Sequence, residues 1–466
     1  MFKRLLAAFL CFVLVFSLAA CNLSFKLPFT QNESNPDTQI SLPSQTPNSS
    51  TQSGTNKTEK PSNNTSSGTT VEKPNNGQSS ENKVDSPAIE TPVIPNTSHK
   101  PVLRENYYQY SSLNETEKKV YNDICSAIEA TQNVISLSKY RLSYNKMWNI
   151  FQKVIADNPQ YFWVSKFIEY THLNQNGNDI IINLILYYTD GDTTDSISGN
   201  KFESMASREK ISGQIAAVNQ QIEAFLATVP TNYSDLEKEY LIHNAILNSI
   251  SYDYAAVGKE LTINNYPRVY DIYGTLINQK AVCEGYSRLF QYLCYQVGIN
   301  STIVIGISED QAHAWNAVSL NGNWYHVDVT WNDGMEGDIP LYDYFNLTTN
   351  SILTDHSIDY SELAVPEATA TEYSFINTFG MQLENLNSAP LNYQNAIDYA
   401  VKFNSPYVYI MVNDENLSHA YSNYLTAYFF GFNSEVQRYI ESKGYNIRFD
   451  SNMISFTSTC IFIKRK

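Results

Sequence analysis

The chain has 466 residues, a formal net charge of −16 and an aromatic content of 13%. The acidic balance argues against a nucleic-acid-binding protein and against direct adhesion to anionic lipid, and it is compatible with basic peptides as partners. The length, less a long polar segment near the start, suits two or three folded domains. The cysteines lack the spacing of a disulfide framework, so a disulfide scaffold is not expected.

The first residues have the composition of a secretory signal. Lys3-Arg4 is basic, an apolar run extends to Leu18, and Leu18-Ala-Ala-Cys21 follows. This order resembles the lipobox of bacterial lipoproteins, in which the cysteine becomes the lipidated N-terminus. An ordinary signal or a single membrane anchor is the alternative, but the run is short for a membrane span. We expect residues 1–20 to be removed and Cys21 to anchor the chain at the extracytoplasmic face of the cell membrane.

Residues 21–100 comprise the expected lipid anchor and a linker rich in Ser, Thr, Asn and Pro. A segment of this composition cannot bury enough apolar surface to fold, so we predict that it is disordered. As a flexible coil of about 79 residues, it would have an end-to-end distance of roughly 50 Å. This linker would hold a folded part of the chain clear of the lipid.

Residues 101–230 are predicted to form an N-terminal α/β extension. Asn114 and Glu117 have the spacing of a capping box at the start of a helix, and Cys125 belongs to the apolar stripe of that helix. A second helix is expected to stop at Asp157-Asn158-Pro159, because proline cannot continue it. The expected elements are helices at 114–128, 144–156 and 209–229 and strands at 161–170 and 179–188.

Cys283 lies at the start of another predicted helix. The apolar residues after it have the three-and-four spacing of a helix that is buried on one side, and Gly298 is typical of a position just beyond a helix end. In the first turn, unpaired N–H groups and the helix dipole favour a thiolate, whose pKa can fall to between roughly 3.5 and 7.5. Gly285, which has no Cβ, would let a substrate backbone approach the sulfur. The alternative is a buried structural cysteine.

A predicted hairpin follows this helix. The segments 312–320 and 323–331 have strand-like composition, and the Asn-Gly pair between them is typical of a two-residue turn. In the register that such a turn imposes, His313 and Asp328 lie on one face of the sheet as diagonal neighbours. A carboxylate could therefore hold the imidazole, whereas a slip by one residue would place the two side chains on opposite faces.

Other histidines offer alternatives to this pair. His326 shares the same predicted face and is a rival base, although it lies nearer the turn and is expected to pack beside tryptophan. A zinc site made of Cys283, His313, His326 and Asp328 is a further alternative, but no close ligand pair supports it, and we expect no metal or other cofactor. His243 is expected to have a packing role. The remaining candidate, His356, is expected either to line the cleft or to have a surface or packing role.

Three motifs around these residues resemble the core of the transglutaminase-like superfamily. They are Ala-Val-Cys283-Glu-Gly-Tyr-Ser, His313-Ala-Trp-Asn and Trp-Tyr-His-Val-Asp328-Val-Thr-Trp. That superfamily has a papain-like fold, with a helix bearing the cysteine packed on an antiparallel sheet, and it includes transglutaminases, peptide N-glycanases and bacterial proteases. The resemblance covers about residues 235 to 360 and implies a catalytic core at 231–365. It also implies that Cys283 is the nucleophile, His313 the base and Asp328 the orienting acid.

The resemblance leaves the oxyanion-binding group open. The backbone N–H of Cys283 is the donor that we expect, and Tyr273 is a second hypothesis. Residues 366–466 lie beyond the resemblance and are predicted to form a small α+β accessory domain. Its expected elements are helices at 393–403 and 434–443, a strand at 406–412, two strands flanking Ser451-Asn452, and a buried Cys460 in the final strand.

Together these features predict a surface-anchored cysteine enzyme that acts on amide bonds of peptides or proteins, such as cell-wall peptide. Hydrolysis is favoured because water is abundant and nothing marks a second, amine-binding site. The alternatives are a protein-glutamine transamidase of the same fold and a non-catalytic scaffold that binds peptide in the cleft. The sequence does not specify an oligomeric state.

Overall fold

The computed structural model describes residues 39–40, 99–175, 178–189, 205–257, 267–333, 341–383, 390–412, 434–456 and 460–465. The predicted signal peptide, Cys21 and most of the predicted linker lie outside these residues. Among the helices of the described part, none combines the length and the apolar character needed to cross a bilayer.

The N-terminal region combines a four-stranded sheet with helices. The capping box predicted at Asn114 and Glu117 is present, and Cys125 is fully buried in the stripe of its helix. The sheet has the order β1-β3-β4-β2. Its strands are β1 (Gln39–Ile40), β2 (Val134–Ser136), β3 (Val164–Gln175) and β4 (Asn178–Tyr188), and the helices are α2 (Tyr108–Ser111), α3 (Glu115–Glu129), α4 (Tyr144–Asp157) and α5 (Met205–Leu226), with the 3-10 turns η1 (Arg104–Asn106) and η2 (Ser138–Tyr140).

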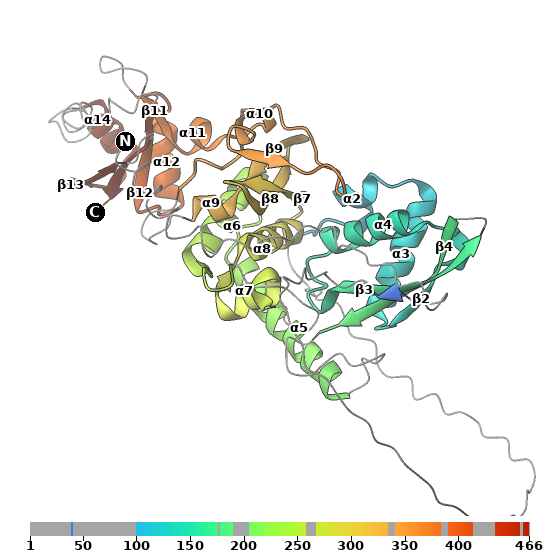
Figure 1. Cartoon of the computed structure of the whole chain (residues 1–466). Coiled ribbons are helices and arrows are strands. Elements are labelled where there is room, and N and C mark those ends of the chain that lie inside the picture. Colours follow the sequence, from blue (N-terminus) through green and yellow to red (C-terminus); the bar gives the residue numbers. More distant parts are fainter. Residues whose placement is uncertain are drawn as a thin grey trace, which may run out of the picture.

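The central region contains a second four-stranded sheet, which is antiparallel and has the order β10-β7-β8-β9. Helix α8 packs against β7 and β8 (Figure 1), so the predicted combination of a cysteine-bearing helix and an antiparallel sheet is confirmed. The elements are α6 (Asp235–Ser249), β5 (Ser251–Tyr252), η3 (Arg268–Tyr270), α7 (Ile272–Asn278), β6 (Lys280–Ala281), α8 (Cys283–Gln296), β7 (Ser301–Ser308), β8 (Gln311–Leu320), β9 (Asn323–Val327), α9 (Val329–Asn332), α10 (Thr349–Ile352) and β10 (His356–Ile358).

The predicted hairpin has the expected register but a shorter second strand. Leu320 pairs with Asn323, and the Asn321-Gly322 turn has positive φ at both residues, as a tight hairpin turn requires. The expectation of a strand over 323–331 is wrong, because β9 ends one residue before Asp328. The Asp328 side chain accepts a hydrogen bond from the N–H of Trp331 and thereby caps the short helix α9.

The N-terminal and central regions share one hydrophobic core, in which buried side chains from both form a single cluster. Polar side chains also join them. The carboxamide of Gln109, on α2, donates to Thr302 Oγ1 of β7 at 2.9 Å and exchanges hydrogen bonds with the backbone of Ala364. On α8, Arg288 and Gln291 donate to carbonyl oxygens at the C-terminal end of α4. The helix that carries Cys283 is therefore enclosed by both regions.

The last region contains the predicted small α+β unit, on the opposite side of the central region from the N-terminal sheet (Figure 1). The expectation of two strands flanking Ser451-Asn452 is wrong, since β13 continues through both residues and pairs with β14. Cys460 begins β14. Its side chain, for which burial was predicted, lies outside the part of the chain that the structure describes. The elements are α11 (Phe375–Thr378), β11 (Met381–Leu383), α12 (Tyr393–Lys402), β12 (Tyr407–Val412), α14 (Glu435–Lys443), β13 (Phe449–Phe456) and β14 (Cys460–Arg465).

Candidate functional site

Cys283 is the first residue of α8, as predicted. The N-cap residue is Val282, which has an extended backbone and offers no side-chain hydrogen bond to the first turn. The N–H groups at the start of the helix therefore lie uncapped beside the sulfur, where they favour negative charge. Cys283 is 5% exposed and packs among Ala156, Ile303 and Ala314, so the end of α4 in the N-terminal region forms one wall around it.

Gly285 does not have the role that the sequence predicted. A Cβ at this position would lie 2.3 Å from the carbonyl oxygen of Val269 and 2.7 Å from Thr275 Oγ1. The missing side chain therefore lets α8 pack closely against η3 and α7 inside the protein. The expectation that Gly285 admits a substrate backbone is wrong.

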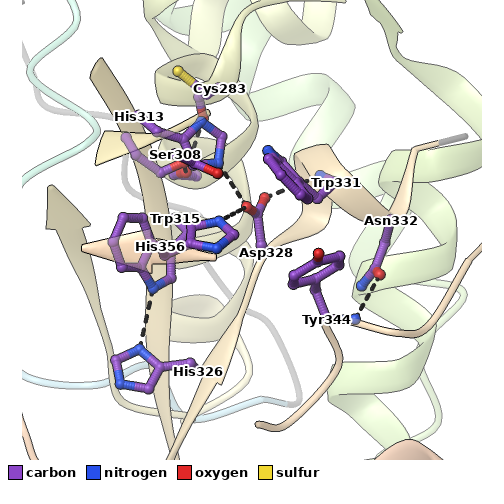
Figure 2. A network of polar contacts seen from close by, with 12 residues as sticks. Cys283, Ser308, His313, Trp315, His326, Asp328, Trp331, Asn332, Tyr344 and His356 are labelled. Carbon is purple, nitrogen blue, oxygen red and sulfur yellow. Dashed lines mark hydrogen bonds and ion pairs between the residues drawn. The ribbon is translucent and has the colours of Figure 1, made fainter. Parts of the chain in front are cut away.

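His313 and Asp328 form the predicted pair. His313 Nε2 lies 2.6 Å from Asp328 Oδ2, the imidazole is nearly buried and the carboxylate is completely buried. Because Nε2 is engaged by the acid, Nδ1 is the ring nitrogen that remains for a hydrogen bond with the Cys283 thiol. Figure 2 shows His313 between the sulfur and the carboxylate, as the diagonal placement across the hairpin predicted.

The charges in this group reinforce one another. Burial favours neutral forms, but Asp328 and the Cys283 sulfur together raise the pKa of His313 to about 10. Burial likewise opposes ionisation of Asp328, whereas His313 and His356 lower its pKa to about 2. At neutral pH the site therefore holds an imidazolium and a carboxylate. The positive ring therefore lies between the Asp328 carboxylate and the Cys283 sulfur.

A second imidazole contacts the same acid. His356 Nε2 lies 3.2 Å from Asp328 Oδ2, and the side chain of His356 is completely buried. The Asp328 carboxylate thus accepts from His313, from His356 and from the Trp331 N–H. The sequence predicted a cleft, surface or packing role for His356 and did not predict this contact. The only local signal is the adjacent Asp355, a carboxylate next to an imidazole.

His326 and His243 have the packing roles that were expected. The Trp315 indole N–H donates to His326 Nδ1 at 3.1 Å, and His326 Nε2 lies 3.2 Å from Thr349 Oγ1. His243 is buried against Asn332, and burial lowers its pKa to about 3, so it is neutral. Both imidazoles are bonded away from the sulfur.

A zinc site made of Cys283, His313, His326 and Asp328 is not supported by these contacts, since His326 is bonded elsewhere. The group of potential metal ligands in the described residues is instead His313, Asp328 and His356, whose ligand atoms lie within 4.8 Å of one another. Each of these atoms already takes part in an imidazole–carboxylate hydrogen bond. The chemistry of the group is therefore explained without an ion.

A buried ion network adjoins Cys283. Glu284, the residue after Cys283, pairs with Lys166 of β3 and accepts from Arg288 Nε at 2.7 Å. Burial opposes its charge, but Lys166 and Arg288 lower the pKa of Glu284. The N-terminal sheet thus contributes a cation beside the start of α8, a position that no sequence motif indicated. Tyr273, the hypothetical oxyanion residue, stacks on Phe162 with ring centroids 5.6 Å apart.

Comparisons with known proteins bear on the central region. Kyphoscoliosis peptidase of Homo sapiens is 34% identical over 146 residues, which are 27% of this chain and 21% of that protein. The Mus musculus protein of the same name is 35% identical over 115 residues, 22% of this chain and 17% of that one. The chain thus spans about a fifth of the length of these curated relatives.

Solved structures give lower similarity. A transglutaminase crystal structure has 20% identity and a TM-score of 0.24, over 36% of this chain and 45% of that chain. A structure described as a candidate cysteine protease from Cytophaga hutchinsonii has 13% identity and a TM-score of 0.20, over 36% of this chain and 64% of that chain.

The model of the transglutaminase-like superfamily matches residues 222–329. This segment contains Cys283, His313 and Asp328, and it is therefore a transglutaminase-like core, which confirms the resemblance of the three motifs.

Proposed function

We propose that this protein is a surface-anchored cysteine enzyme that acts on amide bonds of peptides or proteins, with Cys283 as nucleophile, His313 as acid and base, and Asp328 as the orienting acid. The observation that carries the proposal is the 2.6 Å contact between His313 Nε2 and Asp328 Oδ2, which leaves Nδ1 of the same ring for the thiol at the start of α8. Nucleophilic catalysis by cysteine needs this order of thiol, base and orienting group.

The reaction follows from these positions. The Cys283 thiolate attacks the carbonyl carbon of an amide. The backbone N–H of Cys283, at the uncapped start of α8, stabilises the oxyanion that forms. The C–N bond then breaks, and His313 gives its Nδ1 proton to the departing amine or ammonia, leaving a thioester. Water attacks the thioester while neutral His313 accepts its proton. The products are a carboxylic acid and the restored thiolate–imidazolium pair.

Hydrolysis is the favoured outcome, because water reaches any opened thioester and no amine-binding site is marked by the described residues. Transamidation would replace the water in the second step by a primary amine. Both outcomes require the same first step, so the two activities differ only in what attacks the thioester.

The cellular place of the enzyme is part of the proposal and depends on the sequence alone. The Leu-Ala-Ala-Cys21 motif and the polar linker after it would display the core at the outer face of the membrane, within reach of cell-wall peptide. Incorporation of labelled palmitate into the wild-type chain, and its loss in Cys21→Ser, would support this placement. A palmitate-free wild-type chain in the membrane-free fraction would refute it.

The activity can be tested with casein as a general protein substrate. We expect casein cleavage or release of ammonia by the wild-type chain and neither by Cys283→Ala. Addition of dansylcadaverine separates the two enzymes: a transamidase incorporates the fluorophore into casein, whereas a hydrolase does not.

A substrate-free assay tests the thiol itself. Iodoacetamide should label Cys283 quickly at pH 6, and His313→Ala should slow this labelling by at least about tenfold. Equal, slow labelling of both chains would indicate an unactivated thiol and would favour the non-catalytic scaffold. Cys125 and Cys294 are fully buried and serve as internal references in the same digest.

A further inference from the structure

His356 is held between two carboxylates. It begins the short strand β10 and pairs with Ser308 of β7, which directs its side chain into the protein. Its Nε2 lies 3.2 Å from Asp328 Oδ2, and its Nδ1 lies 2.6 Å from Asp355 Oδ1. The Asp355 side chain is 40% exposed and also accepts from the Tyr344 hydroxyl at 2.6 Å. A line of alternating acids and imidazoles thus runs from solvent to the sulfur.

Both ring nitrogens of His356 contact carboxylate oxygens. A neutral imidazole carries one N–H, so both contacts to carboxylate oxygens are hydrogen bonds only when both ring nitrogens are protonated. Three aromatic rings also surround it, with centroids 4.8 Å (Trp331), 5.0 Å (Trp315) and 5.5 Å (Tyr344) from its own. Aromatic rings at such distances attract cations.

We propose that Asp355 and His356 extend the Cys283–His313–Asp328 site. His356 is a positioning residue that holds Asp328 and, as an imidazolium, lowers the pH at which the thiolate–imidazolium pair forms. This inference rests on the proposed function, because it assigns His356 a role in the same site. The outer carboxylate of Asp355 holds one edge of the His356 ring, and the inner carboxylate of Asp328 is shared by the His313 and His356 rings.

The charged and titratable groups that face His356 come from several elements. His313 faces it from β8, and Asp328 faces it from the start of α9. Asp355 and Tyr344 face it from the segments before β10, and His326 faces it from β9. The two acids balance two imidazolium rings. Loss of the His356 charge would leave Asp328 with a single cationic partner and would strengthen the hold of that acid on the His313 proton.

The predicted effect has a definite sign. Removal of a positive charge makes every neighbouring group release its proton at higher pH. The ring centroids of His313 and His356 are 5.5 Å apart. At an effective dielectric constant of about 20 to 40, one charge at that distance shifts a neighbouring titration by about 1 to 2 pH units.

The test is the rate of Cys283 alkylation by iodoacetamide between pH 4 and 10, in the wild type and in His356→Gln. Glutamine removes the charge and keeps an N–H donor. We expect the inflection at acid pH, where the thiolate–imidazolium pair forms, to move about 1 to 2 units to higher pH in His356→Gln. The matched control is His326→Gln, a buried histidine on the same sheet that contacts Trp315 instead of an acid, which should leave the inflections in place.

The outcomes separate this inference from the proposed function. A wild-type Cys283 that labels slowly at pH 6, as His313→Ala does, would refute the proposed function and this inference together. Fast wild-type labelling with unmoved inflections in a folded His356→Gln would overturn only the role of His356. A reduced rate without a shift would mean that His356 merely supports the structure, which also overturns the inference.

A second measurement covers the case in which His356→Gln fails to fold. In wild-type chain labelled with [15N]histidine, both ring nitrogens of His356 should give protonated signals at pH 7. Asp355→Asn, a change at a partly exposed side chain, identifies these signals, because it should lower the pH at which the second proton is lost. A His356 ring with one unprotonated nitrogen at pH 7 in the wild type would overturn the inference.

Discussion

Replacement of Asp328 by asparagine isolates the role of the buried acid with almost no change of shape. The carboxylate accepts from the ring N–H groups of His313 and His356 through the same oxygen, Oδ2. If the amide nitrogen takes that position, it faces the two ring N–H groups as a donor, and a donor cannot accept. His313 must then become neutral and turn its proton toward the thiol. The variant therefore holds the wrong tautomer and loses the imidazolium that supports the thiolate.

The magnitude follows from the electrostatics of the wild-type site. Burial disfavours the imidazolium of His313, and Asp328 is the largest of the influences that raise its pKa to about 10 from 6.5. Loss of a shift of this size would lower the thiolate–imidazolium population near pH 6 by about 10²- to 10³-fold. The free energy of unfolding should also fall by about 3 to 5 kcal/mol, because one partner of a buried charge pair is removed.

The assay is iodoacetamide labelling of Cys283 at pH 6 together with urea unfolding. The matched control is Asp271→Asn, which alters another buried acid that caps a helix and pairs with Arg268. Both variants should be destabilised, but only Asp328→Asn should lose labelling. A folded Asp328→Asn chain that labels within about threefold of the wild type would refute the assignment of Asp328 as the orienting acid.

Three further predictions follow from burial and packing. The pKa of His313 is raised in the folded chain, so the stability that its protonation provides is fully present below pH 6.5 and is lost as the pH rises through about 10. Urea unfolding should therefore show a free energy of unfolding that is lower at pH 10 than at pH 6 by at most about 5 kcal/mol. This difference should be absent in His313→Gln. Gly285→Ala should destabilise the chain by about 3 kcal/mol, since its Cβ meets the Val269 carbonyl, whereas Gly213→Ala, whose Cβ has open space, should be neutral or stabilising by up to about 1 kcal/mol; equal melting temperatures would contradict this. A chain that begins at residue 231 should not fold cooperatively, because Arg288 loses its partner on α4; a sharp thermal transition in that fragment would contradict this.

The sequence predicted the parts of the site that depend on local patterns. The helix after Cys283 follows from its three-and-four spacing, and the hairpin register follows from a turn that allows only one short pairing. That register was enough to place His313 and Asp328 on one face. The helical turn at Asp328 was missed because Val329 and Thr330 have strand-like composition, whereas the Asp328 side chain caps the Trp331 N–H and ends the strand.

The contact of His356 with Asp328 could not be predicted in the same way. Strand β10 has three residues and acquires its position only by pairing with Ser308, far away in the sequence. No local periodicity specifies such a pairing. The Lys166–Glu284 pair likewise joins residues 118 positions apart, one from each of two regions that share a core. Both features depend on tertiary packing, and neither leaves a pattern in the residues around it.

The enclosure of α8 explains why the N-terminal region belongs to the site. Every residue from Cys283 to Tyr295 is buried, including the polar Glu284, Arg288 and Gln291. A buried polar group is costly unless it is hydrogen-bonded, and these side chains find their partners on α4 and β3. The position of the sulfur is therefore set from two sides, by the sheet that carries His313 and by the region that precedes the transglutaminase-like core. Under the proposed function, residues of the N-terminal region can therefore alter substrate preference without any change in Cys283, His313 or Asp328.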